Sequence, residues 1–111
     1  MKRGHIYFAN LDPTVGSEIN KKRPVLVLSN DINNHYSETI TVIPITSSIS
    51  RIRSFEVFIP AVEANLPKDS KAKCDQIRTI DKSRFINELG KLSQNYIIDV
   101  EVALRIHLDI M

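Results

Sequence analysis

An arginine and a threonine at the ends of two neighbouring strands are the side chains best suited to chemistry. Arg23 precedes the apolar run 24–29, and Thr46 ends the β-branched run 39–46. If these runs pair as an antiparallel hairpin, with residue numbers that sum to about 70, Arg23 lies beside Thr46. Opposed residues have Cβ atoms about 4.5–5.5 Å apart, so a guanidinium and a hydroxyl can converge on one phosphate.

Further basic and amide side chains accompany this pair. Lys21 and Lys22 come directly before the arginine and would attract a nucleic-acid backbone. If residues 71–77 form a strand, Gln76 and Arg78 share one face, where an amide can bind a base edge and a guanidinium a phosphate. The competing interpretation is structural: each of these side chains also fits an exposed strand or strand end.

Short strands must position these side chains. They are expected at residues 5–9, 24–29, 39–46, 55–59 and 71–77. The run 24–29 is apolar throughout, with a proline only at its first position, and is the candidate for the centre of the sheet. Pro44 indicates an edge strand or a bulge. Residues 30–38 are typical of a turn, and residues 81–84 of a short helical turn.

The C-terminal stretch fits two patterns. Every even position from Ile98 to Ile110 is apolar, as in a strand, but thirteen residues greatly exceed the usual strand length of about 5–6. The helical alternative has Ser93 as its N-cap and an apolar stripe, so we expect a helix over 93–104 followed by an extended tail. Strands joined by loops too short for parallel crossovers, followed by one helix, indicate a curled antiparallel sheet or small barrel.

Composition limits the function classes. The chain has 111 residues, 42% hydrophobic and 25% charged, which suits one folded domain and excludes a second catalytic domain. The formal net charge of +2 means that any site for a polyanion must be local. No apolar run approaches the roughly 20 residues that cross a bilayer, and no signal-peptide segment precedes Asn10, so we expect a cytoplasmic protein without a membrane partner.

Neither metal binding nor a disulfide is expected. Cys74 is the one cysteine and cannot form an intramolecular disulfide, so it is interpreted as a small buried apolar group. The three histidines, at positions 5, 35 and 107, are far apart in the sequence and have no ligand spacing. We therefore expect no metal and no cofactor.

Three motifs in series resemble the MazF/PemK family of toxin endoribonucleases. They are Arg3-Gly4-x-Ile6-Tyr7-x-Ala9-Asn10-Leu11-Asp12-Pro13 with Lys22-Arg23-Pro24-Val25-Leu26-Val27, then Ile45-Thr46-Ser47, then the block from Gln76 to Arg84. The resemblance covers nearly the whole chain in the correct order. It implies one MazF/PemK-like toxin domain over residues 1–111, built as an SH3-like barrel of antiparallel strands with short helices and a C-terminal helix.

The resemblance also implies an activity and partners. It implies a homodimeric toxin that cleaves single-stranded mRNA at a short sequence without a metal, leaving a 2′,3′-cyclic phosphate and a 5′-hydroxyl, and that a cognate antitoxin neutralises. Arg23 and Thr46 are the implied catalytic residues. The implied RNA-binding residues are Ser17, Lys21, Lys22, Gln76, Arg78 and Arg84. The loop 10–22 would cover the site until the antitoxin displaces or occupies it.

The implied chemistry leaves one role open. Because the pKa of arginine exceeds about 12, Arg23 suits electrostatic stabilisation and proton donation to the leaving 5′-oxygen better than proton abstraction. The general base therefore stays unassigned. Two other functions are compatible with the fold: a non-enzymatic, CcdB-like toxin that poisons DNA gyrase, and an SH3-like binding module. The motifs that contain Arg23 and Thr46 favour the nuclease.

Overall fold

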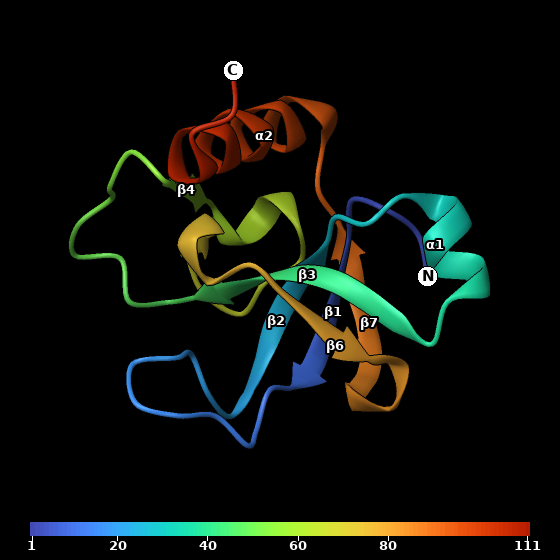
Figure 1. The fold of residues 1–111 in the computed structure, drawn as a ribbon. Helices are drawn as coiled ribbons and strands as arrows, with labels where there is room; N and C mark the ends of the chain where they lie inside the picture. The colour runs from blue at the N-terminus through green and yellow to red at the C-terminus, as the bar shows by residue number, and fades with distance from the viewer.

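Seven strands form one sheet, and a helix of fifteen residues lies against one side of it (Figure 1). The computed structural model describes residues 1–111. The strands are β1 (His5–Asn10), β2 (Lys22–Val27), β3 (Thr39–Thr46), β4 (Glu56–Ile59), β5 (Ser70–Lys73), β6 (Arg78–Asp81) and β7 (Phe85–Lys91). The helices are α1 (Asp31–Tyr36), α2 (Gln94–Leu108) and the 3-10 turns η1 (Ala61–Glu63), η2 (Cys74–Gln76) and η3 (Lys82–Arg84). This confirms the expected class, and the curled sheet is compatible with a small barrel.

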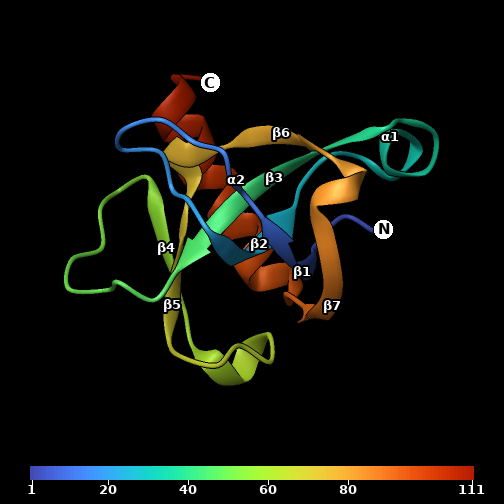
Figure 2. The ribbon, with the colours of Figure 1, turned by 90° about the horizontal axis from the view of Figure 1, so that it is seen from below.

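All strand pairs are antiparallel, in the order β4-β5-β3-β2-β1-β7, with β6 also on β3. The central position expected for the second strand is confirmed, because β2 lies between β1 and β3. Strand β3 has two successive partners along one edge. Its residues 39–42 pair with β6 and its residues 45–46 pair with β5 (Figure 2).

The prediction that Pro44 marks an edge strand or a bulge is wrong. Pro44 lies inside β3, directly opposite Val25 of β2, in a regular register. Its other side falls between the ladder to β6, which ends at Val42, and the ladder to β5, which begins at Ile45. Proline is tolerated in this inner strand because it occupies the gap between the two ladders, where β3 changes partners.

A single strand over residues 71–77 is also wrong. Strand β5 ends at Lys73, and η2 then turns the chain so that β6 can pair with the other half of β3. The shared strand face predicted for Gln76 and Arg78 therefore does not exist, since Gln76 lies on η2 and Arg78 on β6. The sequence analysis also missed β6 and β7.

Residues 30–38 contain a helix where a turn was expected. The side chain of Asn30 accepts a hydrogen bond from the backbone N–H of Asn33 at 2.9 Å and caps the first turn of α1. Buried Asn34 donates to the carbonyl of Ser29 at 2.7 Å. These side-chain bonds stabilise a helix whose residues have weak intrinsic helix propensity.

The helical interpretation of the C-terminus is confirmed, but the extended tail expected after residue 104 is wrong as far as Leu108, because α2 runs about one turn further. Ile97, Val100 and Ala103 are buried against the sheet, whereas Ile98 and Val102 are exposed. The helix thus has one buried and one exposed apolar stripe, and together they account for the apolar residues at alternate positions that resembled a strand. Neither α-helix has the length and apolar character that crossing a bilayer requires. The short helical turn predicted near residue 81 is confirmed as η3, capped by the Asp81 side chain.

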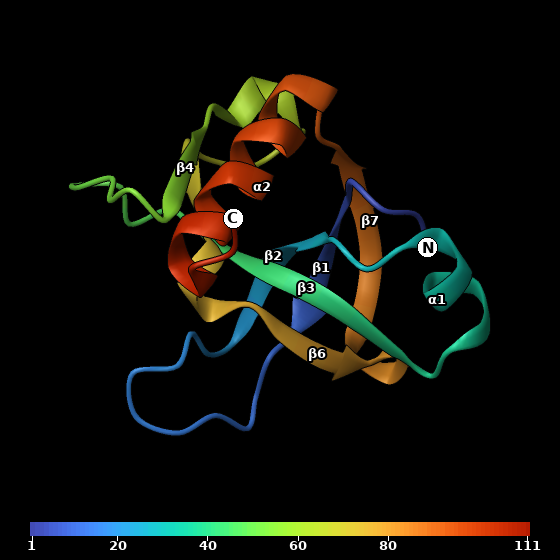
Figure 3. The same cartoon turned by 45° about the horizontal axis from the view of Figure 1, so that its top comes forward.

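Two buried clusters stabilise the sheet from opposite faces. The larger one fills the space between the sheet and α2, and it includes Leu26, Ile43 and Cys74, as expected of a buried cysteine (Figure 3). The smaller one lies on the other face and contains Val25 and Val27. Because side chains alternate along a strand, Arg23 points to the face of Val25 and Val27.

Candidate functional site

The predicted hairpin between Arg23 and Thr46 exists as β2 and β3. Val25 lies opposite Pro44, and continuing this register by two residues sets Arg23 opposite Thr46. Both residues then lie on the same face of the sheet, since each is two positions from a residue of one opposed pair. The ladder itself ends at Val25 and Pro44, and the other edge of β3 pairs with β5 from Ile45 onward. Arg23 and Thr46 therefore occupy the rim of the sheet.

Each of the two side chains contacts the loop that adjoins its own strand. Arg23 donates from Nε to the carbonyl of Asn20 at 2.9 Å, and it makes no ion pair with a carboxylate. Thr46 accepts a hydrogen bond at Oγ1 from the backbone N–H of Ser48 at 3.2 Å. Both side chains are half-buried. A fixed positive charge without a carboxylate partner suits a phosphate at this rim.

The loop 11–21 between β1 and β2 is closed at its base. The N–H of Leu11 donates to the carbonyl of Lys21 at 2.9 Å, and the N–H of Lys21 donates to a carboxylate oxygen of Asp12 at 3.0 Å. Lys21 has a φ of 69°, in the left-handed region, and this conformation turns the chain into β2. The exposed Lys21 and Lys22 extend the positive charge of Arg23 along this edge.

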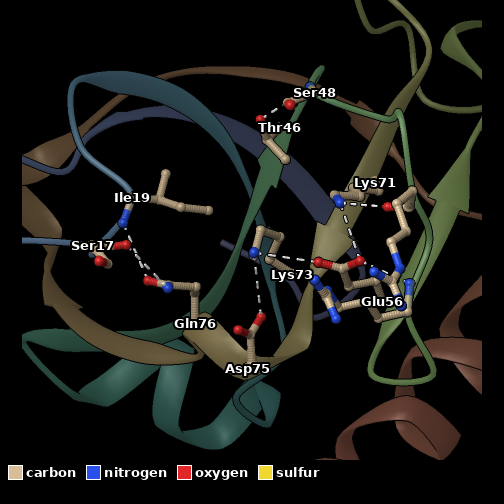
Figure 4. Close-up of polar contacts among 11 residues, drawn as sticks. Ser17, Ile19, Thr46, Ser48, Glu56, Lys71, Lys73, Asp75 and Gln76 are labelled. Carbon is tan, nitrogen blue, oxygen red and sulfur yellow. Dashed lines mark hydrogen bonds and ion pairs between the residues drawn. The ribbon is translucent and has the colours of Figure 1, made fainter.

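Three of the predicted RNA-binding residues hold this loop. Gln76 accepts from the N–H of Ile19 at 3.2 Å and donates to the carbonyl of Ser17 at 3.4 Å, as Figure 4 shows. Arg78 donates to the carbonyl of Leu11 at 3.2 Å. Arg84 donates to the carbonyls of Asn10, at 3.2 Å, and Asp12.

The structure thus gathers all the predicted RNA-binding residues around one loop. Ser17 is exposed at its outer end, Lys21 and Lys22 lie at its end, and Gln76, Arg78 and Arg84 contact its backbone. A polar groove of about 390 Å³ beside the loop is lined by Glu18, Asp75, Gln76, Ile77 and Arg78. No group of three or more His, Cys, Asp or Glu side chains is arranged to hold a metal ion.

Sequence reasoning missed a buried ionic cluster next to Thr46. Its members are Glu56 on β4 and Lys71 and Lys73 on β5. Lys71 lies opposite Thr46 in the β3–β5 ladder, so the two side chains share a face. The strands predicted at 55–59 and 71–77 contain these residues, but only the β4–β5 register of the structure sets Glu56 opposite Lys73.

The Glu56 carboxylate is ionised inside the protein. Burial opposes this, but hydrogen bonds from the Arg53 N–H and the Lys71 ammonium, together with the Lys73 ammonium 3.3 Å from the other oxygen, outweigh burial and lower the pKa of Glu56. By contrast, burial and the neighbouring carboxylates of Asp75 and Glu56 raise the pKa of the Cys74 thiol to about 12. That thiol is therefore protonated and unreactive at neutral pH.

Known proteins resemble this chain over its length. A model of the PemK-like, MazF-like toxins of type II toxin-antitoxin systems matches residues 2–108. Endoribonuclease EndoA of Bacillus subtilis (strain 168) is 42% identical over 97% of this chain and 94% of its own. Endoribonuclease MazF9 of Mycobacterium tuberculosis is 38% identical over 99% of this chain and 98% of its own.

A solved structure extends the similarity to the fold. The crystal structure of MazE-MazF (Form-II) from Deinococcus radiodurans superposes with a TM-score of 0.80 at 26% identity and covers 100% of this chain and 97% of that chain. Sequence and structure therefore agree, and the chain belongs to the PemK-like, MazF-like family of toxins of type II toxin-antitoxin systems.

Proposed function

We propose that this protein is an endoribonuclease toxin that cleaves single-stranded mRNA at a short sequence. The observation that carries the proposal is the position of Arg23 and Thr46 at the rim of two adjoining strands, on one face and beside a lysine-rich edge. The relatives EndoA and MazF9 are named endoribonucleases, which supports the same reaction class.

The proposed reaction uses a nucleophile that the substrate carries. The ribose 2′-hydroxyl attacks the adjacent phosphorus, loses its proton, and forms a pentacovalent phosphorane whose breakdown expels the 5′-oxygen. The products are a 2′,3′-cyclic phosphate and a 5′-hydroxyl. Since no water needs to be activated, the reaction requires no metal-bound hydroxide.

Arg23 and Thr46 have different proposed roles in stabilising the phosphorane. The guanidinium of Arg23 binds the negatively charged oxygens and donates a proton toward the leaving 5′-oxygen, while the Thr46 hydroxyl stabilises a phosphorane oxygen. Ser17, Lys21 and Lys22 bind the RNA backbone along the loop 11–21. Gln76, Arg78 and Arg84 complete the RNA site once the loop has moved, and the general base stays unassigned.

The proposal includes two protein partners. As a type II toxin, the chain would be neutralised by a cognate antitoxin, and the similar Deinococcus radiodurans structure contains MazE with MazF. We expect the antitoxin to engage the loop 11–21, most of whose residues are exposed. We also expect a homodimer that acts in the cytoplasm.

Mapping the 5′ ends of cleaved RNA tests the activity. Purified protein is incubated with a long mRNA in the presence of EDTA, and the new ends are sequenced. We expect cuts at one short sequence, with 5′-hydroxyl and cyclic phosphate termini. Intact RNA under all conditions would overturn the proposal, and cleavage that stops with EDTA would overturn its metal-independent form.

The gyrase-poisoning alternative is not favoured, because the relatives that match nearly the full chain are named endoribonucleases. A DNA gyrase supercoiling assay separates the two functions. The proposed nuclease leaves gyrase unaffected at concentrations that degrade RNA.

A further inference from the structure

The buried ionic cluster lies between the two loops that border Arg23 and Thr46. The Glu56 side chain is only 1% exposed, and its two oxygens lie 3.1 Å from Lys71 Nζ and 3.3 Å from Lys73 Nζ. Figure 4 shows both lysines pointing toward the carboxylate from the adjoining strand. Two ammonium groups converge on one buried carboxylate and form a junction, because the Glu56 carboxylate would lose its charge partners if the lysines moved.

One side of the cluster holds the loop 47–54, which follows Thr46 directly. Lys71 Nζ donates to the carbonyl of Arg51 at 2.7 Å, and the Arg53 N–H donates to Glu56 Oε1 at 2.9 Å. Seven of the eight loop residues are exposed, so packing contributes little to the loop conformation. The cluster supplies the charged tethers of a loop that carries two arginines and no acidic residue.

The other side of the cluster reaches the loop 11–21 through η2. Lys73 Nζ lies 4.0 Å from Asp75 Oδ1, a buried oxygen that has no hydrogen-bond partner. Asp75 is next in sequence to Gln76, whose amide contacts the backbone of Ser17 and Ile19 (Figure 4). This contact links the cluster to η2, which carries the Gln76 amide.

We propose that Glu56 is a positioning residue for RNA binding, which sets the relative position of the loops 11–21 and 47–54 by holding Lys71 and Lys73. This inference rests on the proposed nuclease function. Glu56 lies too deep to touch RNA, and its effect passes through the loops. Loss of its charge releases the loops while Arg23 and Thr46 keep their places on the sheet.

Steady-state cleavage of a short RNA with one cleavage site tests the inference. In E56Q the carboxylate loses its charge at nearly constant shape, and we expect KM to rise about tenfold, the effect of one charge-assisted hydrogen bond, with kcat within about twofold. E56D keeps the charge and should recover part of the loss. E63Q, the same change at an exposed residue outside the cluster, should behave as wild type.

A second measurement makes the test independent of RNA. Amide hydrogen exchange in the free protein should become faster in E56Q at Arg53, whose N–H binds Glu56, and at Ile19, whose N–H binds Gln76. Should E56Q fail to fold, K71M removes the tether to Arg51 together with the Lys71–Glu56 ion pair and leaves Glu56 paired with Lys73, and faster exchange within 47–54 is then expected.

The outcomes separate the two proposals. Wild-type protein that cleaves no RNA refutes the proposed function. In that case the hydrogen-exchange data by themselves decide whether Glu56 positions the two loops. A folded E56Q with the KM of wild type, or with unchanged exchange at both amides, overturns the positioning role. A fall in kcat with KM unchanged also overturns it, because that pattern places Glu56 in the chemical step.

Discussion

The two loops beside the candidate site differ in the contacts that hold them directly. Loop 11–21 leads into Arg23, loop 47–54 follows Thr46, and both project from the same side of the molecule in Figures 1 and 3. The first is closed by hydrogen bonds at the surface, such as those of Gln76. The second is tethered to the buried carboxylate of Glu56.

This difference predicts that loop 11–21 can exchange its hydrogen-bond partners, whereas loop 47–54 keeps its contacts. A hydrogen bond near the surface contributes about 0.5–1.5 kcal/mol, because water or a ligand can replace it. Breaking a buried charge pair costs about 3–5 kcal/mol, because one charge is left unpaired. A ligand can therefore replace the contacts of loop 11–21 more easily than those of loop 47–54, and under the proposed function that ligand is RNA or an antitoxin.

The largest effect is expected where both loops meet the sheet. R23A should lower RNA cleavage about 10⁴-fold, since it removes phosphorane stabilisation and proton donation together. T46V removes one hydroxyl and should cost about 10²-fold. Initial rates on a short RNA, with circular dichroism to check folding, measure both.

A matched control is R105A, an exposed arginine on α2, which should cleave at the wild-type rate. A folded R23A that retains full activity would refute the catalytic role. Equal losses in R23A and R105A would instead indicate a general effect of net charge on RNA binding.

The second largest effect is expected on the free energy of unfolding, when the Glu56 carboxylate that tethers loop 47–54 is removed. E56A leaves Lys71 and Lys73 buried without their carboxylate and should lower the free energy of unfolding by about 3 kcal/mol. E63A, at an exposed site, should change it by less than about 0.5 kcal/mol. Urea unfolding followed by circular dichroism measures both, and an E56A protein as stable as E63A would show that the cluster is no structural junction.

The acid stability of the protein should depend on the same carboxylate. The pKa of Glu56 is lower in the folded protein than its unfolded value of about 4.3, so its contribution is complete above that value and is lost as the pH falls through the folded pKa. Hydrogen bonds also lower the pKa of Asp31, Asp81 and Glu88, so acid weakens wild type at several sites.

The contribution of Glu56 is therefore measured by comparing the pH dependence of the free energy of unfolding in E56Q and in wild type. The free energy of unfolding of E56Q should fall less between pH 6 and pH 3 than that of wild type, a range that includes the pKa of about 4.3 of a glutamate in the unfolded chain. E63Q should follow wild type. Parallel curves for E56Q and wild type would contradict an ionised Glu56 held by the two lysines.

The sequence was sufficient where a feature depends on neighbours in the chain. The hairpin of 24–29 and 39–46 has a short connection and strong strand patterns, and its register brought Arg23 and Thr46 to one rim. The helix that begins after Ser93 has an apolar stripe of helical period. Both features follow from local pattern, and both predictions agree with the fold.

The sequence failed where a distant partner decides the structure. Residues 71–77 have the pattern of one strand, but β3 offers two separate edges, so the chain turns at η2 between them. The role of Gln76 and Arg78 as contacts of loop 11–21 depends on that turn. The Glu56 cluster depends on the β4–β5 register, which no short-range pattern reports.

The smallest effect tests the loop expected to open. Q76A removes two hydrogen bonds to loop 11–21, at Ile19 and at Ser17, both partly open to water. We expect a loss of stability of no more than about 1 kcal/mol, because water replaces the amide at both sites. Exchange of the Ile19 amide should become faster, while exchange of the Arg53 amide should stay unchanged, since its partner is Glu56.

If both amides respond to Q76A as they do to E56Q, the two loops form one cooperative unit and the contrast between them is wrong. A response confined to Ile19 means that loop 11–21 opens on its own, so RNA or an antitoxin can displace it without disturbing the ionic cluster beneath Thr46.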